Sequence, residues 1–552
     1  MKRIPILVAL LSTSQVALAQ QAPDAGQQIH QIPSPALQPQ APPIQIDRPR
    51  AAVVAETGGA NVRVDALRVT GQTLFSEQQL LAATDFKPGS TLNLSGLRAI
   101  AGQITRFYNE HGYFLATAYL PAQDVSGHSV HIAVVEGRYG AIEINRQGAL
   151  SSGQARGALA GLAGGDAVTS GRLERRLLLL SDIPGVDVSS TLSPGTVVGT
   201  SDLVVNLKRG RLLSGMVEAD NGGNRFTGAY RGGGTLNFNN PTGHGDLLTL
   251  RALGSTSGLA YGRAAYQRLF RDTTIGVAFS HINYSLGREF KALDADGTAD
   301  VASLFGSHPL VRSRDTNLNL LAGVDAKFFK DRLGAASTVS RRRAYVANLG
   351  LGGNHRDHLG GGGSTQFSLG VTVGDLDIRS AADSAIDATT ARTNGGYAKL
   401  HGGIARLQRV TGALSLYGAL RGQMAFNNLD SAEKMQLGGA YGVRAYPEGE
   451  GYGDEGYIAT AEARLQLPQL IPVPGAFQLF GFVDAGAVHF AKNPWFTGRN
   501  AAHRSGVGAG LAWTSPDNFL VKATYAHKLG DQEVTSERDR DGRFWFQLAK
   551  LF

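Results

Sequence analysis

From Arg211 to the end of the printed sequence, the chain consists of short segments in which apolar and polar residues alternate, with little helical periodicity. In "YIATAEARLQLP", for example, Tyr457 and the alanines lie on one face, and Glu462 and Arg464 lie on the other. A period of two is the pattern of β-strands that have two different faces. Clusters such as "NNPTGHGD" separate the segments, and Gly is frequent, at 72 of 552 residues. The C-terminal part is therefore predicted to be all-β.

Both a soluble β-sandwich and a membrane β-barrel would show this alternation. The expected strands have about 9 to 12 residues, which is enough to cross a bilayer with tilt. Their polar face carries Glu462, Arg464 and Asp484, which a packed sandwich core would not accept unpaired. Strands can span lipid only as a closed barrel, because lipid cannot hydrogen-bond the backbone. The pattern favours an antiparallel transmembrane β-barrel.

The last segment, "RFWFQLAKLF", has aromatic residues where chain ends are normally polar. Phe544, Phe546, Leu548 and Phe552 share one face of this predicted strand. Lys550 interrupts that face, which is acceptable near an interface where a long side chain can reach water. We interpret the segment as the closing strand, which must pair with the first strand to leave no free edge.

The first residues predict export. Lys2 and Arg3 precede an apolar stretch, and Ala17 and Ala19 form a small-residue cleavage site, so residues 1–19 are expected to be a signal peptide. No later run of 18 apolar residues could form a transmembrane helix. Residues 20–60, rich in Gln, Pro and Ala, are typical of an extended linker, with a possible short helix around Asp24 to Ile32.

Residues 62–210 show the same order of elements twice: strand, helix, strand, strand. In the first copy, Leu97, Ile100 and Ile104 lie at helical spacing, with Ser95 as the expected N-cap. In the second, Leu173, Leu177 and Leu180 form one stripe. The repeat predicts two small domains that each mix a sheet with helices.

The composition excludes several classes of function. The formal net charge is +8, but no run of Lys and Arg is interleaved with aromatic residues, and the densest group, Arg341 to Arg343, lies within a strand-like stretch. The chain has no Cys, so disulfides and thiolate sites are absent. HExxH, P-loop and GxSxG motifs are also missing. We therefore predict no enzyme activity, no cofactor, no metal and no nucleic-acid partner.

Several stretches, in their order and spacing, carry a resemblance to a known family: "LERRLLLLSDIPGVDV", "DNGGNRFTGAYRGGGTLNFNNPTGHGDLLTLR", "QLGGAYGVRAYPEGEGYGDEG" and "FGFVDAG". The chain resembles the hemolysin secretion/activation family, the outer-membrane transporters of two-partner secretion (TpsB type). The resemblance covers essentially the whole mature chain. It implies POTRA domains at residues 61–139 and 140–210, followed by a barrel of about 16 strands over residues 211–552.

In this family, a Val-Arg-Gly-Tyr tetrad in the sixth extracellular loop packs inside the barrel, and its Arg pairs with the Asp of a Phe-x-Asp-x-Gly strand motif. The matching residues here are Val443, Arg444, Ala445 and Tyr446, and Phe482, Asp484 and Gly486. Ala445 departs from the family's Gly, which would cause strain if the position needed a positive φ. From spacing alone, Arg444 and Asp484 are equally well ordinary lumen-facing charges, and Tyr446 an ordinary loop aromatic. The resemblance also makes Phe544, Phe546, Leu548 and Phe552 the signal that the barrel-assembly machinery reads.

The resemblance further implies a monomeric barrel in the Gram-negative outer membrane, surrounded by the lipid bilayer, with the POTRA domains in the periplasm. Its partner would be an unfolded secreted exoprotein that crosses the barrel without nucleotide hydrolysis. The POTRA domains would bind this partner by strand addition, and "SVHIAVVEG" or "SDLVVNLKRG" is a plausible free edge. A helix in the linker would plug the pore at rest.

Three alternatives remain. An assembly factor that inserts other barrels shares the loop and strand motifs, but it usually carries a different number of POTRA domains. An outer-membrane barrel enzyme would need a catalytic constellation at the rim of the barrel. A passive porin would lack residues 62–210.

Overall fold

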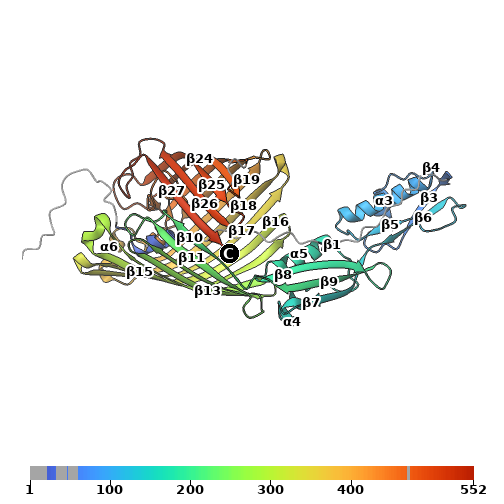
Figure 1. The fold of residues 1–552 in the computed structure, drawn as a ribbon, viewed down its shortest axis with the longest axis horizontal. Coiled ribbons are helices and arrows are strands. Elements are labelled where there is room, and N and C mark those ends of the chain that lie inside the picture. Colours follow the sequence, from blue (N-terminus) through green and yellow to red (C-terminus); the bar gives the residue numbers. More distant parts are fainter. Residues whose placement is uncertain (1–21, 33–45, 48–59, 469–472) are drawn as a thin grey trace, which may run out of the picture.

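The computed structural model describes residues 22–32, 46–47, 60–468 and 473–552. The expected signal peptide and most of the linker lie outside these residues. The described chain forms one large barrel, and two small α/β units extend from one end of it (Figure 1).

The barrel is closed and has sixteen strands, each hydrogen-bonded to its neighbours in an antiparallel ladder. Its strands are β10 (Leu213–Asp220), β11 (Arg231–Asn239), β12 (Asp246–Ser255), β13 (Leu259–Phe270), β14 (Thr273–Ser285), β15 (Ala295–Arg312), β16 (Thr316–Leu333), β17 (Thr338–Asp357), β18 (Gly363–Ile378), β19 (Gly395–Arg409), β20 (Leu414–Ala425), β23 (Glu455–Gln466), β24 (Ala476–His489), β25 (Ala501–Thr514), β26 (Phe519–Lys528) and β27 (Gly542–Leu551). The last strand pairs with the first, with Met216 opposite Leu551. The predicted antiparallel barrel of about 16 strands is confirmed.

The four longest wall strands are neighbours, and all exceed the expected 9 to 12 residues. β15 and β16 have 18 residues each, β17 has 20 and β18 has 16. At a rise of about 3.3 Å per residue, an 18-residue strand is about 60 Å long, and a tilt of about 40° leaves roughly 45 Å along the barrel axis. The apolar band of an outer-membrane barrel is only about 25 Å tall. These strands therefore extend well beyond the membrane.

The two faces of the wall differ as the alternation predicts. In β23, Tyr457, Ala461 and Ala463 are exposed on the outside, whereas Ile458 and Glu462 are buried on the inside. Apolar side chains that are 44–58% exposed continue this outer face around the barrel. Among them are Val277, Leu304, Val324, Leu349, Val371 and Leu479.

The closing strand has the predicted orientation. Phe544, Phe546 and Phe552 lie on the outer surface, 57%, 37% and 45% exposed. Lys550 shares this face, and its ammonium lies 4.2 Å from the centre of the Phe519 ring. Phe552 continues the ladder, because its N–H donates to the carbonyl of Gly215 over 3.0 Å. The use of this strand as an assembly signal stays a prediction.

The first α/β unit contains β2 (Val62–Val64), β3 (Ala66–Thr70), α2 (Glu77–Ala82), β4 (Ser90–Leu92), α3 (Leu94–Glu110), β5 (Thr117–Tyr119) and β6 (Ser129–Val135). Helix α3 buries Leu97, Ile100 and Ile104 against the sheet, as their spacing predicts. The N-cap is Asn93 rather than Ser95: its side chain accepts from the N–H of Gly96 over 2.8 Å. This places an Asn side chain where it satisfies a free N–H of the first turn.

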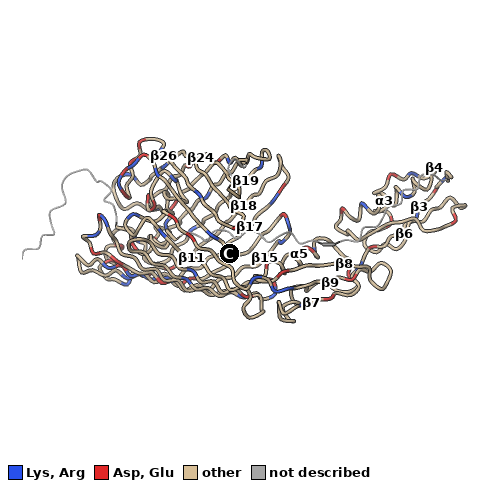
Figure 2. The backbone as a smooth tube through the Cα atoms, in the orientation of Figure 1, with Lys and Arg blue, Asp and Glu red and all other residues tan. Residues whose placement is uncertain are grey.

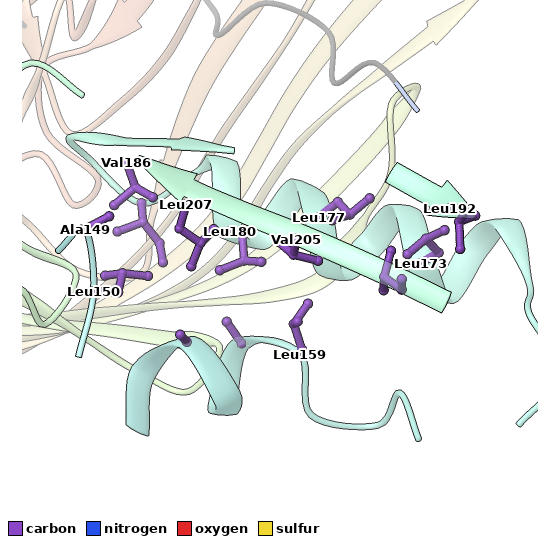
Figure 3. Packing of buried hydrophobic residues seen from close by; sticks show 14 of the residues in the cluster. Ala149, Leu150, Leu159, Leu173, Leu177, Leu180, Val186, Leu192, Val205 and Leu207 are labelled. Carbon is purple, nitrogen blue, oxygen red and sulfur yellow. The ribbon is translucent and has the colours of Figure 1, made fainter. Parts of the chain in front are cut away.

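The second unit contains β7 (Arg138–Asn145), α4 (Ser152–Ala158), α5 (Ser170–Ser181), β8 (Val186–Pro194) and β9 (Thr200–Arg209). Leu173, Leu177 and Leu180 of α5 are fully buried against the sheet (Figure 3). A two-residue strand of the linker, β1 (Ile46–Asp47), pairs in parallel with β8 at the edge of this sheet. Residues 46–47 of the linker therefore lie at the edge of the second unit.

The expectation about free edges is wrong for both named segments. β6, from "SVHIAVVEG", lies between β3 and β5, and β9, from "SDLVVNLKRG", lies between β7 and β8. β6 is central because β3 pairs with it in parallel across a long crossover, and β7 pairs with β9 in the same way. The outer strands of the two sheets are β3, β5 and β7, together with β1 beside β8.

The Glu136 carboxylate is buried in the first unit. It accepts hydrogen bonds from the N–H of Thr73 at 2.6 Å, the N–H of Leu74 at 2.8 Å and the hydroxyl of Tyr108 at 3.1 Å. Burial alone would raise the pKa of this carboxyl, but these hydrogen bonds favour the charged form and lower its pKa below the ordinary value. Such a group stabilises the fold above its unfolded pKa, and the stabilisation is lost as pH falls through its folded pKa.

Glu136→Gln is therefore expected to lower the stability of the first unit by roughly 1.5–3 kcal/mol at neutral pH, since hydrogen bonds to a charge are lost. Protection factors from hydrogen exchange in β3 and β6 of the full chain would measure the change. The difference from wild type should shrink as pH falls below the folded pKa of Glu136. Glu143→Gln, at an exposed position of β7, is the control and should change little. A pH-independent difference would contradict the role given to the charge.

Lys and Arg are scattered among Asp and Glu along the part of the chain that the structure describes (Figure 2). In the described residues, three or more His, Cys, Asp or Glu side chains nowhere form a group that could hold a metal ion. None of the helices in the described ranges is both long and apolar enough to cross a membrane.

Candidate functional site

The segment between β20 and β23, residues 426–454, folds back into the barrel and is called the inward loop here. It contains η4 (Ser431–Glu433), β21 (Met435–Gln436) and β22 (Tyr452–Gly453), and β21 pairs with β22. Val443, Ala445 and Tyr446 have no exposed surface, and Arg444 is 6% exposed. The tetrad predicted for this loop is therefore packed against the inside of the wall.

Arg444 contacts the predicted strand motif of β24. Its Nε and Nη2 donate to the two carboxylate oxygens of Asp484 over 2.7 and 2.8 Å, and its backbone N–H donates to Oδ2 over 3.1 Å. Asp484 is fully buried and also accepts from the hydroxyl of Thr460 over 2.9 Å. A two-pronged Arg–carboxylate pair fixes orientation as well as distance.

A second carboxylate, which the motif did not indicate, completes this contact. Arg444 Nη1 donates to Glu462 Oε1 over 2.7 Å, and Arg464 Nε donates to the other oxygen of Glu462 over 2.8 Å. The two Arg and the two acidic residues balance in charge. A closed, neutral network of this kind can remain buried, whereas any member left alone would be an uncompensated charge.

The Phe and Trp side chains of the wall also hold Arg444. The Phe482 ring lies under its guanidinium, 3.4 Å from ring centre to Cζ. Trp545, on the inner face of the closing strand β27, donates from Nε1 to the carbonyl of Arg444 over 2.7 Å. The tetrad is thus tied both to its strand motif and to the closing strand of the barrel.

Small residues make space for the loop. A Cβ at Gly486 would lie 2.7 Å from the side chain of Leu437, and a Cβ at Gly506 would lie 2.4 Å from that of Ala445. Ala445 does not have a positive φ, so the strain considered for the departure from Gly is absent. Gly506 accommodates the extra methyl group instead.

A second buried contact ties the inward loop to the last extracellular loop, residues 529–541. Glu450 is fully buried and accepts from Arg504 Nη2 over 2.6 Å. It also accepts from the N–H groups of Thr535 and Ser536, each over 2.9 Å. The guanidinium of Arg504 lies over the Tyr446 ring at 5.1 Å. Tyr446 therefore stacks beside a different ion pair from that of Arg444.

A short helix of the linker, α1 (Ala25–His30), lies inside the barrel. Its N-cap, Asp24, accepts from Arg342 Nη2 over 2.9 Å and from the Ser431 hydroxyl over 2.6 Å. The N–H of Ala25 donates to Asp331 over 2.8 Å. At the other end of α1, Arg231 donates to the carbonyl of Gln31. The helix suggested by the weak signal near Asp24 to Ile32 is present.

Arg342 is the centre of this contact. Besides Asp24, it pairs with Asp331 at 3.1 Å and with Asp430 of the inward loop at 2.5 Å. One cation thus holds three carboxylates that come from the linker helix, the wall and the loop. Alternation along β17 points Arg342 into the lumen, while its neighbours Arg341 and Arg343 point outward.

The fold and these contacts define a class of protein: an outer-membrane β-barrel transporter that has α/β domains on one side and an internal loop and helix in its lumen. Residues 199–513 match the family model "Haemolysin secretion/activation protein ShlB/FhaC/HecB", and residues 62–137 match "POTRA domain, ShlB-type". The chain belongs to the ShlB/FhaC/HecB family. It is an outer-membrane transporter of the two-partner secretion type, with its POTRA region in the periplasm, and its class implies a secreted protein partner.

Relatives support this placement. The chain is 27% identical to the heme/hemopexin transporter protein HuxB of Haemophilus influenzae, over 84% of this chain and 82% of the relative. It is 26% identical to the outer membrane transporter CdiB of Dickeya dadantii, over 77% and 76%. The solved structure of CdiB from Escherichia coli has a TM-score of 0.71 at 22% identity and covers 91% of this chain and 93% of its own. That structure supports the fold.

Proposed function

We propose that this transporter captures one unfolded secreted partner in the periplasm and passes it through the barrel lumen to the cell surface. The observation that carries the proposal is that side-chain contacts hold α1 inside a closed barrel. The barrel wall is continuous, and α1 is not part of it. The helix belongs to the linker that precedes the two α/β units, and its N-cap Asp24 is 318 residues away from Arg342, which holds it. A segment held in this way can leave without opening the wall.

The outer strands β3, β5 and β7 are the sites that we propose for partner capture. An extended polypeptide can add to such an edge through backbone hydrogen bonds, while side-chain pockets provide selectivity. The edge beyond β8 is already paired with the linker strand β1. Residues 138–209 repeat the order of strands and helices of the matched POTRA domain, and we propose that they form a second one.

No nucleotide-binding motif is found in the sequence, so we propose that folding of the partner outside the cell drives transport. We further propose that the chain acts as a monomeric barrel, that the barrel-assembly machinery inserts it, and that it has no enzyme activity.

Arg342→Ala is expected to unplug the lumen. The substitution leaves Asp24 facing Asp331 and Asp430 with no cation between them, and like charges at short range repel. Single-channel recordings in planar bilayers should show at least a several-fold increase in open time. Arg341→Ala, one residue away but on the outer surface, should conduct like wild type. Equal conductance of the Arg342 variant and wild type would show that the contact does not hold the plug.

The function itself is tested by co-expression with a candidate partner, a large secreted protein. Surface exposure of that protein, measured by protease accessibility on whole cells, should require the transporter. Insertion of unrelated outer-membrane barrels should be unaffected when the transporter is deleted. The reverse pattern would identify an assembly factor instead.

A further inference from the structure

The outer surface of strands β14–β18 carries cations that the transport function does not use. Lys330 of β16 lies opposite Arg341 of β17, and the N–H of Arg379 donates to the carbonyl of Arg341 over 2.8 Å, continuing the row onto the end of β18. Lys330, Arg341 and Arg379 are all exposed. They lie toward the end of the barrel opposite the POTRA region, which is the extracellular end.

These cations are only partly neutralised. Neither Lys330 nor Arg341 makes an ion pair among the described residues. Arg343, two residues along β17, pairs with Asp377 at 2.9 Å, and Arg379 shares the same carboxylate at 3.2 Å. Asp375 lies on the same outer face of β18. The four cations Lys330, Arg341, Arg343 and Arg379 thus face only the two carboxylates of Asp375 and Asp377, so the surface keeps an excess of positive charge.

Two other acidic side chains at this end of the barrel have partners of their own. Asp300 lies 2.7 Å from Nδ1 of His281, and Asp296 pairs with Arg332. The row is therefore suited to an anion.

A belt of large rings lies directly next to the cations on the membrane side. Phe279, Phe328 and Tyr345 are 52%, 45% and 51% exposed on β14, β16 and β17. Aromatic girdles of this kind mark the interface of a barrel with the lipid head groups. The cations are thus placed at the level of the outer-leaflet head groups or just above it.

The wall is hollowed beside this belt, with Tyr345 in the lining, and the hollow extends from there toward the membrane interior. A depression of about 780 Å³ lies where small side chains face outward, at Ala302, Ala326 and Ala347. Leu304 and Val373 are among the apolar residues that line it. Its lining is mostly apolar, so it is suited to hydrocarbon rather than to a polar ligand.

We propose that this surface binds one phosphorylated lipid of the outer leaflet, with an acyl chain in the depression and a phosphate on Lys330, Arg341 and Arg379. Arg and Lys are the side chains that bind phosphate, Arg as a two-pronged donor and Lys as a point charge. The order of hydrocarbon groove, aromatic belt and cation row matches the order of acyl chain, glycerol or sugar, and phosphate in such a lipid. The site gives the long strands a fixed position in the membrane.

The test uses the full chain, purified in detergent, and lipid A that carries both of its phosphates. Native mass spectrometry measures how much lipid stays bound. The triple variant Lys330→Gln, Arg341→Gln and Arg379→Gln should bind about tenfold less tightly. The matched control, Arg288→Gln, Lys291→Gln and Arg499→Gln, removes the same charge from exposed loop positions and should stay within twofold of wild type.

Two further measurements test the phosphate and the acyl chain separately. Dephosphorylated lipid A should bind at least tenfold more weakly than the intact lipid, and inorganic phosphate alone should not displace it. Ala326→Trp fills the depression but leaves the cations, and it should also reduce binding. Heat-modifiable migration shows that each variant is folded. Wild-type binding by the folded triple variant, equal binding of the dephosphorylated lipid, or displacement by free phosphate would overturn the proposal.

Discussion

Replacing Arg444 by alanine is expected to abolish secretion of the partner while the barrel still reaches the membrane. The change leaves the Asp484 carboxylate and one carboxylate oxygen of Glu462 without their cation in a buried site. Such a loss destabilises the buried site by about 3–5 kcal/mol. The substitution also removes the side chain that packs on Phe482. The wall is held by its own backbone ladder, so insertion should survive. Secretion is measured by immunodetection of the partner in the medium, and insertion by heat-modifiable migration.

Two variants make this prediction specific. Arg464→Ala removes the other cation on Glu462 but leaves the Arg444–Asp484 contact, so secretion should fall only slightly. Arg444→Lys keeps the positive charge but loses the two-pronged contact of the guanidinium with Asp484, so this variant should secrete at an intermediate level. Wild-type export by a folded Arg444→Ala transporter would refute the role given to the inward loop.

Deletion of residues 62–210 is expected to abolish partner capture but not closure of the barrel. All sixteen wall strands lie outside the deleted segment, and β10 pairs only with β11 and β27. The contacts that are lost lie at the periplasmic rim, such as the Arg176–Asp272 pair at 3.0 Å and the Arg312–Asp182 pair at 2.6 Å. Pull-down of the unfolded partner by the detergent-solubilised transporter measures capture.

A shorter deletion, of residues 62–137, is the companion variant, because it keeps the rim contacts of the second unit. If the long deletion fails to give the heat-modifiable form while the short one succeeds, the second unit is needed for assembly and the prediction of an autonomous barrel is wrong. Undiminished pull-down by the long deletion would contradict the assignment of capture to these domains.

The wall was predictable from the sequence because its pattern is local. In a strand, the parity of a position decides its face, so Glu462 and Asp484 on the inside and Phe544 on the outside follow from alternation once the barrel is assumed. Parity also separates the Arg341–Arg343 triplet, which stands out in the sequence only as a charge cluster, into one lumen-facing and two outward side chains.

Contacts between distant segments were not predictable from the pattern. The edges of the two α/β sheets were misplaced because β6 and β9 gain parallel partners across crossovers that leave no local signal. The Arg444–Asp484 contact was expected only through the family resemblance. The Glu450–Arg504 and Asp24–Arg342 contacts depend on how a long loop and a linker helix fold back, which no periodicity records.

We propose above that the partner crosses through the lumen of the closed barrel. Adjacent residues of β16 offer a matched test: Asp325 faces the lumen, where Ser303 donates to it over 2.6 Å, and Val324 is 49% exposed on the outer surface. A photo-crosslinking amino acid placed at each position during active secretion should capture the partner from position 325 and not from 324. Adducts from 324 alone, or none from 325 while secretion continues, would contradict passage through the lumen.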